Sequence, residues 1–402
     1  MNLSLAWRTV ALLACAAALN YADRTSISSV FPLLRRDLGL TDKDLGAVGS
    51  YFLWAYAFAS PFAGYLADRL PRGRLVAASL FAWSLVTLWT SFAGSLRELL
   101  ASRILLGVAE CAYLPAAVAL IADHNPSSSR GRAMALHLMG LNAGLVGGGT
   151  LAGFLGETHG WRFGLQILAA AGVVLSGICA LFLREGPGRQ AATARVAAEP
   201  LGAQLRSVLS NVPYLYLAVQ AALVSIGTWM FFNWMPLYFR ESFGLSLGIA
   251  GFSGTATLQL SAVLGALVGG FVSDRVSVGD PARGRLRVMM ICYLFCAPCL
   301  LMFLVPGAGF AAISAAVVVF SLMRAMATAN ETPVMCDLIP AENRSTAQAF
   351  MNMANTIAGG IGVYVAGSFK EDYGLSAIFA GVSAVMLVAT FFVLLASRQR
   401  RA

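Results

Sequence analysis

The sequence is poor in charged residues. Of its 402 residues, 12% are Asp, Glu, Lys or Arg and 58% are hydrophobic, whereas soluble domains carry roughly 25% charged residues. It also lacks common sequence motifs of enzyme active sites: we find no Walker motif, no zinc-ligand spacing and no nucleophile elbow. These absences argue against an enzyme and indicate a polytopic membrane protein.

Clusters of basic residues are also absent. The net charge is +9, but the arginines are scattered singly among short loops, so we expect no nucleic-acid partner. The seven cysteines lie in apolar runs and are interpreted as small helix fillers without a metal or disulfide role. We also interpret the glycine-rich stretch GLNAGLVGGGTLAG (140–153) as a surface for close helix packing rather than as a nucleotide loop.

Hydrophobic runs of membrane length are what the sequence does have. A window of about 20 residues predicts twelve spans, near 5–34, 45–67, 75–94, 98–122, 131–154, 162–183, 211–239, 246–272, 286–305, 308–336, 345–368 and 374–396. We therefore predict an all-α membrane protein with an N-terminal six-helix bundle (1–184), a cytoplasmic linker (185–206) and a C-terminal six-helix bundle (207–402).

Orientation follows from the loops. With the N-terminus inside, 18 basic residues fall on the cytoplasmic side, 7 fall outside and 3 lie within helices. The positive-inside rule then predicts a protein of the inner (cytoplasmic) membrane with both termini in the cytoplasm.

The two halves repeat each other. GYLADRLPRGRL (64–75) is echoed by GGFVSDRVSVGDPARGRL (269–286), and SSRGRAMA (128–135) is loosely echoed by ENRSTAQA (342–349). Arg103 and Glu110 are seven residues apart, as are Arg324 and Glu331. Halves that repeat in the same sense are a transporter architecture.

These motifs carry a resemblance. GYLADRLPRGR resembles the loop signature that the major facilitator superfamily has between its second and third helices. The copy in the second half, between helices eight and nine, lies where that family has its second loop signature. NYADR (20–24), RILLGVAE (103–110) and SRGRA (129–133) are similar to two branches of it. One is the anion:cation symporter branch of sialin-like and sugar-acid carriers. The other is the spinster branch of lysolipid carriers, which ENRSTAQAF favours.

Four charged residues within the apolar spans need an explanation, because each costs roughly 2.5 to 3.5 kcal/mol at the centre of a bilayer helix. Arg103, Gly107 and Glu110 share one helix face, and Gly107 is expected to leave space between the two charges. Asp23 and Arg24 are neighbours that point about 100° apart, so each should find its partner on another helix. We predict that they face Arg103 and Glu110, with the pairing left open.

Such a site can couple an anion to a proton. A carboxylate in an apolar cavity favours its neutral form and a nearby guanidinium favours the charged one, so an anion that engages the guanidinium promotes protonation. We predict Asp23 and Glu110 as proton-coupling residues and Arg103 and Arg24, with Tyr21, as substrate-binding residues; the resemblance implies the same roles for the four charged residues. The proton is the expected coupling ion, without a cofactor or metal.

The second half has fewer charges. Arg324 and Glu331 share a helix face, but WMFFNWMPLYF (229–239) opposite them carries no charge. We predict Asn233, Arg324 and Glu331 as further substrate-binding residues. The aromatic richness of this helix keeps a lysolipid or other amphiphile as the alternative substrate.

The loop signature predicts a cytoplasmic gate. Gly64 is expected to allow close approach of the second and eleventh helices, and Asp68 to be held by an arginine or a helix end. The predicted gate consists of Gly64, Asp68, Arg69, Arg72, Asp274 and Arg275. Together the patterns predict a monomeric secondary transporter of a small organic anion, working by proton symport and alternating access.

Overall fold

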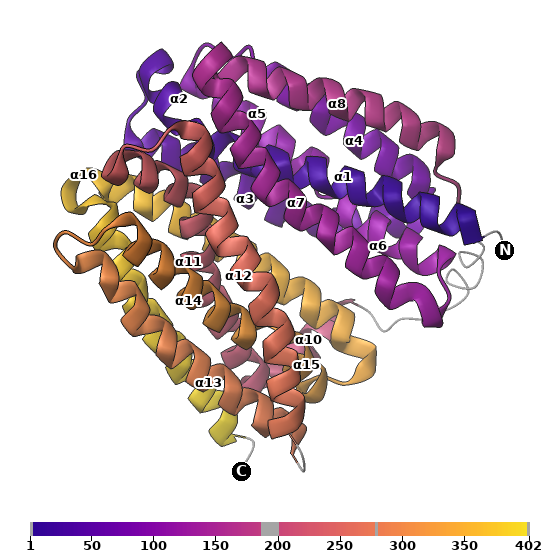
Figure 1. Ribbon diagram of the computed structural model, residues 1–402. Coiled ribbons are helices and arrows are strands. Elements are labelled where there is room, and N and C mark those ends of the chain that lie inside the picture. Colours follow the sequence, from indigo (N-terminus) through magenta and orange to yellow (C-terminus); the bar gives the residue numbers. More distant parts are fainter. Residues whose placement is uncertain (1–2, 186–200, 278–279, 400–402) are drawn as a thin grey trace. The chain divides into compact units, whose positions relative to one another are not determined.

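The computed structural model describes residues 3–185, 201–277 and 280–399, and the regular structure in these residues is helical throughout (Figure 1). The first half contains α1 (Leu3–Ser29), α2 (Phe31–Leu38), α3 (Asp42–Arg69), α4 (Arg72–Thr90), α5 (Leu96–Glu110), α6 (Tyr113–His124), α7 (Ser127–His159) and α8 (Trp161–Phe182).

The second half contains α10 (Leu201–Ser210), α11 (Val212–Phe243), α12 (Leu247–Val276), α13 (Pro281–Leu300), η2 (Leu301–Leu304), α14 (Phe310–Thr328), α15 (Glu331–Leu338), η3 (Ala341–Asn343) and α16 (Arg344–Gln399). By its contacts the chain divides into two compact units. The first comprises Met1–Ala198 with Leu245–Phe252, and the second comprises Glu199–Gly244 with Ser253–Ala402. Most of the predicted linker lies outside the described residues.

The twelve predicted spans all coincide with helices. Within the described residues, ten helical segments are long and apolar enough to cross a membrane, and one of them, Ala341–Gln399, covers two predicted spans. This long segment bends at Gly374, whose φ of 71° and ψ of 156° are not helical. The remaining span is α3, whose 28 residues exceed the roughly 20 needed to cross the hydrocarbon core.

Proline breaks the predicted spans 98–122 and 308–336 in the same way. A proline within a helix lacks the N–H that would bond the carbonyl four residues earlier, and its ring clashes with that carbonyl. Pro115 therefore separates α5 from α6 at Cys111, and Pro333 separates α14 from α15 at Ala329. Glu110 ends α5 and Glu331 begins α15, so the buried Glu110 and the half-buried Glu331 both lie at a helix break.

The echo between SSRGRAMA and ENRSTAQA is a repeat in structure. Arg130 and Arg344 each donate to two carbonyls at the end of the preceding helix, α6 or α15. Their Nε atoms donate to the carbonyl five residues earlier, at 3.4 and 3.2 Å, and their Nη2 atoms to the carbonyl eight residues earlier, at 3.2 and 2.8 Å. Both arginines thus satisfy orphan carbonyls at a helix C-terminus.

Glycines bring α7 against α1. A Cβ atom on Gly140, Gly144 or Gly148 would collide with the main chain of α1, and the four-residue spacing places these glycines on one face of α7. The packing role predicted for this glycine-rich stretch is confirmed. It fixes the position of α1, which carries Asp23 and Arg24.

Candidate functional site

The first unit buries an ion pair between α1 and α5. Arg24 Nε lies 3.0 Å from Glu110 Oε2, and the two side chains are 6% and 0% exposed. Helix α1 therefore directs Arg24, rather than Asp23, at the glutamate of α5. The structure brings together the residues that the sequence predicted and answers the pairing that it left open.

Three aromatic rings surround the Arg24 guanidinium. Its carbon lies 4.5 Å from the centroid of Tyr21, 4.6 Å from that of Tyr56 and 5.1 Å from that of Phe52. A cation over aromatic faces is stabilised by their quadrupoles, and more so away from water. Phe52 and Tyr56 were not among the predicted site residues. Their spacing of four on α3, a single helical face, is the signal that could have found them.

Arg103 is buried near the pair, but no carboxylate of the described residues lies within ion-pair distance of it. Its Nε donates to the Val48 carbonyl at 3.3 Å, and its guanidinium carbon lies 4.8 Å from the Phe52 centroid. It forms no ion pair with any residue in the described part of the chain. A guanidinium in this state retains donors for an anion.

Polar atoms in the cluster are left unused. Within the described residues, Asp23 Oδ1, Glu110 Oε1 and Asn20 Nδ2 are buried and have no hydrogen-bond partner. Asp23 interacts electrostatically with Glu110 and Arg103. Buried polar atoms are seldom unsatisfied unless they have a functional role, so the two carboxylate oxygens are suited to accept a proton or a ligand donor, and the Asn20 amide is suited to donate.

Gly107 has a different role from the predicted one. It does not serve to separate Arg103 from Glu110, because it faces α3: a Cβ atom there would lie 2.6 Å from the Phe52 carbonyl oxygen and 2.8 Å from the Tyr56 nitrogen. The glycine allows α5 to approach the α3 backbone closely. It thereby places the aromatic rings of α3 beside the arginines.

In the second unit, Arg324 and Glu331 do not form an ion pair. Glu331 Oε1 instead accepts from the Tyr293 hydroxyl at 3.0 Å and from Gln220 Nε2 at 3.2 Å. Arg324 is buried, and its Nε has no hydrogen-bond partner among the described residues. Tyr293 was not a predicted site residue, and its single position on α13 gave no sequence signal.

The polar and aromatic residues of α11 mostly serve packing. Asn233 donates to the Trp229 carbonyl of its own helix at 2.9 Å. Phe231, Trp234 and Phe239 are fully buried in the core of the second unit, where the Phe231 and Phe379 rings stack 4.5 Å apart. These aromatic residues form core rather than an open apolar surface, which weakens the sequence argument for an amphiphile.

The arginines of the loop signature GYLADRLPRGR contact different partners. Arg72 forms an ion pair with Asp123 at the end of α6, and the Arg69 guanidinium lies 4.0 Å from the Tyr65 centroid. A Cβ atom on Gly64 would meet nothing within 4 Å. The side chain of Asp68 lies outside the described residues, and the predicted gate across the two halves stays a prediction.

The copy of the signature in the second unit forms a chain of charges. Arg285 lies 3.7 Å from Asp274 and 3.3 Å from Asp337 at the end of α15. Arg275 is exposed and forms no ion pair with the described residues. In both units an arginine at the start of a helix therefore binds an aspartate near the end of a short helix that follows a proline break.

The sequence profile of the major facilitator superfamily matches residues 13–280 and 254–402, which is nearly the whole chain. The chain belongs to the major facilitator superfamily. Its fold of two six-helix bundles is the one predicted. Since its relatives bear the names of transporters, this family member is a multi-pass membrane transporter rather than an enzyme.

Two relatives illustrate the range of similarity. The chain is 28% identical over 398 residues to a protein named MFS-type efflux pump from Mycolicibacterium smegmatis, covering 96% of this chain and 89% of that one. It is also 28% identical over 298 residues to a probable galactarate/D-glucarate transporter of Bacillus subtilis, covering 67% of this chain and 65% of that one. It thus spans less than two thirds of the second relative.

Among solved structures, a bacterial homolog of the human lysosomal transporter Spinster, inward-facing and unoccupied, matches with a TM-score of 0.83 at 20% identity, covering 99% of this chain and 98% of that one. At this level of identity the likeness concerns the fold alone.

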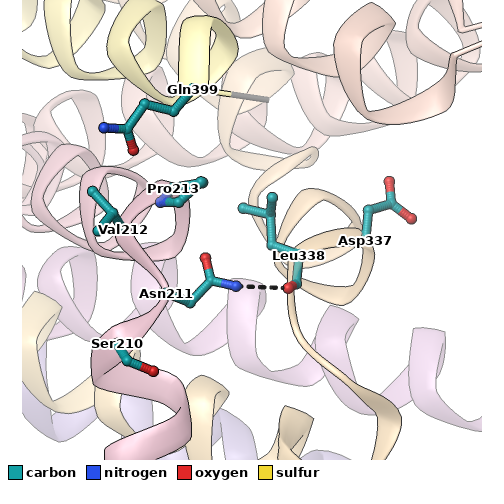
Figure 2. A pocket seen from close by; sticks show the side chains of 7 residues that line it. All are labelled: Ser210, Asn211, Val212, Pro213, Asp337, Leu338 and Gln399. Carbon is teal, nitrogen blue, oxygen red and sulfur yellow. Dashed lines mark hydrogen bonds between the residues drawn. The ribbon is translucent and has the colours of Figure 1, made fainter. Parts of the chain in front are cut away.

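A pocket of about 560 Å³ in the second unit of this transporter lies apart from the predicted site residues (Figure 2). It lies where α10, α11, α15 and α16 begin or end, and Asn211 Nδ2 donates across it to the Leu338 carbonyl at 2.9 Å. Asp337 also lines it, but its carboxylate is engaged by Arg285. None of the predicted substrate-binding residues lines this pocket.

Proposed function

We propose that this major facilitator protein is a proton-coupled symporter of a small organic anion, such as a sugar acid or another carboxylate. It works by alternating access in the cytoplasmic membrane, as a monomer with both termini in the cytoplasm. The Bacillus subtilis relative is named as a probable galactarate/D-glucarate transporter, which supports this substrate class. The proton is the coupling ion, and no other cofactor takes part.

One observation carries the proposal. The buried Arg24–Glu110 pair, at 3.0 Å, lies in the same charged cluster as Arg103, which has no carboxylate partner among the described residues. Arginine stays charged and grips a carboxylate through parallel hydrogen bonds. Arg103 is therefore the first contact for the anion, and Arg24 is the contact for which the anion competes with Glu110.

Coupling follows from this competition. When a substrate carboxylate engages Arg24, Glu110 loses its cation partner while it remains buried. A buried carboxylate that loses its cation and gains no other donor in its place favours the protonated form. Substrate binding thus promotes proton uptake at Glu110, with Asp23 as the second acceptor. Release of the anion restores the ion pair and expels the proton.

The test uses purified protein in proteoliposomes. Addition of a sugar acid should drive proton uptake by the parent protein, measured with a pH-sensitive dye. Glu110→Gln and Asp23→Asn should each reduce this uptake at least tenfold. They should retain exchange of labelled substrate across the membrane, which needs no net proton movement.

The control is Glu342→Gln, which removes an exposed carboxylate and should leave both assays unchanged. If Glu110→Gln and Asp23→Asn both leave substrate-driven proton uptake intact, the coupling assignment is wrong. A parallel thermal-shift screen compares sugar acids, dicarboxylates and lysophospholipids at several pH values. Stabilisation by lysophospholipid alone, without pH dependence, would replace the organic anion by an amphiphile.

A further inference from the structure

An apolar groove runs along the surface of the second unit between α12, α13 and α14. Its volume is about 430 Å³, within the range of about 300 to 1,000 Å³ typical of ligand sites. Its wall is apolar throughout, with side chains from three helices: Val272 and Val276 of α12, Ile291, Phe295 and Cys299 of α13, and Val319 of α14. Such a groove fits a hydrocarbon chain.

The length of the groove matches one leaflet of a bilayer. Its wall on α13 follows a four-residue spacing, which is one helical face, from Arg287 through Ile291 and Phe295 to Cys299. Twelve residues of helix rise about 18 Å. Half of a hydrocarbon core of about 30 Å is about 15 Å, so one acyl chain of a membrane lipid would occupy the groove from end to end.

Cations gather at one end of the groove. Arg287 lines it and, since the wall is apolar, contributes its aliphatic stem, which leaves the guanidinium free to extend toward water. Arg283 lies one turn earlier on the same face of α13. Neither forms an ion pair with the described residues, because the nearby Asp274 and Asp337 are engaged by Arg285.

We propose that this groove binds a phospholipid with an anionic headgroup from the surrounding bilayer. One acyl chain lies along α13, and the phosphate is bound by Arg287 and Arg283. An arginine near the membrane surface attracts an anionic lipid by about 1 kcal/mol. Two arginines at one end therefore select an anionic headgroup over a zwitterionic one. The inference does not depend on the transported substrate.

Native mass spectrometry of the full chain tests headgroup selection. The protein is released from micelles that contain equal amounts of phosphatidylglycerol and phosphatidylcholine. The parent should retain phosphatidylglycerol preferentially. Arg287→Gln and Arg283→Gln should each weaken this retention about fivefold and the double variant about 30-fold, because about 1 kcal/mol per arginine converts to these factors. Arg132→Gln, an exposed arginine of the first unit, is the charge-matched control and should retain the parent's preference.

A second pair of variants tests the groove itself. Ile291 lines it and Leu294 does not, although both lie on α13 and both are 52% exposed. Ile291→Trp should fill the groove and reduce phosphatidylglycerol retention at least fivefold, whereas Leu294→Trp should not. Equal retention of the two lipids by the parent, or equal retention by the two tryptophan variants, would overturn the proposal. Thermal unfolding of each variant confirms that it is folded.

Discussion

The two units hold a glutamate in opposite ways. In the first unit Glu110 is paired with the cation Arg24 at 3.0 Å. In the second, Glu331 accepts from the neutral donors Tyr293 and Gln220, while the Nε of Arg324 has no partner among the described residues. An anionic substrate competes more strongly for a cation than for two neutral donors, because hydrogen bonds between charged partners are the stronger ones. The same arginine-to-glutamate spacing therefore supports a coupling site in the first unit and a fixed polar network in the second.

Replacement of the two arginines should separate the units most clearly. Arg24→Met leaves Glu110 buried without a cation and should lower the free energy of unfolding by about 3 to 5 kcal/mol. Arg324→Met leaves both hydrogen-bond donors to Glu331 in place. Its free energy of unfolding should therefore stay within about 1 kcal/mol of the parent's. The measurement is equilibrium unfolding in mixed detergent micelles.

The double variant Arg24→Met/Glu110→Gln is the control for the first unit, because it removes both charges. It should recover at least half of the stability lost by Arg24→Met. Equal losses for Arg24→Met and Arg324→Met would contradict the contrast between a cation-paired and a neutral-paired glutamate.

How much of this contrast could be predicted depends on what helix periodicity encodes. The face shared by Arg103 and Glu110, and the need of Asp23 and Arg24 for partners on another helix, predicted that the four charges would gather. Periodicity gives only the relative angle of neighbours on one helix. Whether α1 turns Asp23 or Arg24 toward Glu110 is decided by its packing against the α7 glycines, between segments far apart in sequence.

The helix breaks could have been predicted from local sequence, because a proline disrupts the helix at the carbonyl four residues earlier, but the prediction of the spans did not use this rule. Pro115 and Pro333 break the helix at the residue four positions earlier, Cys111 or Ala329, as the missing N–H requires. The donors to Glu331 could not be predicted in this way. Tyr293 and Gln220 come from α13 and α11 and have no spacing in common with it.

The loss of stability on removal of one donor to Glu331 tests whether this carboxyl group is charged, as Glu110 is in its ion pair. Tyr293→Phe removes a hydroxyl that donates to this carboxylate at 3.0 Å, and a hydrogen bond to a charged acceptor is worth about 1.5 to 3 kcal/mol. Tyr214→Phe is the control in the same unit, because its hydroxyl donates to the neutral Ala347 carbonyl at 2.7 Å and should cost about 0.5 to 1.5 kcal/mol. Equilibrium unfolding of the two variants in parallel gives the difference between their free energies of unfolding. Equal losses of stability would mean that Glu331 is neutral.

The aromatic rings around Arg24 can be displaced without touching a charge. Gly107→Ala would place a Cβ atom 2.6 Å from the Phe52 carbonyl oxygen and should destabilise the protein by about 1 to 3 kcal/mol. It should also reduce anion uptake, because α3 must move away from Arg24. Gly64→Ala, where a Cβ meets nothing within 4 Å, should keep the parent's stability or gain up to about 1 kcal/mol. Uptake and unfolding measured on both variants test this, and a Gly107→Ala variant with the parent's uptake would show that the ring positions do not matter.

The smallest losses of stability should come from substitution of Arg130 and Arg344, which make the same hydrogen bonds in the two units. Each arginine donates to two carbonyls at a helix C-terminus with the same residue spacing, so Arg130→Gln and Arg344→Gln should each cost about 0.5 to 1.5 kcal/mol. The two losses should be equal within about 0.5 kcal/mol, as unfolding in mixed micelles would measure. Arg132, two residues after Arg130 near the start of α7, makes no such bonds among the described residues, so Arg132→Gln should change stability by less than about 0.5 kcal/mol. Unequal losses for Arg130→Gln and Arg344→Gln would mean that the two units differ at the C-terminal ends of α6 and α15 as well as at their glutamates.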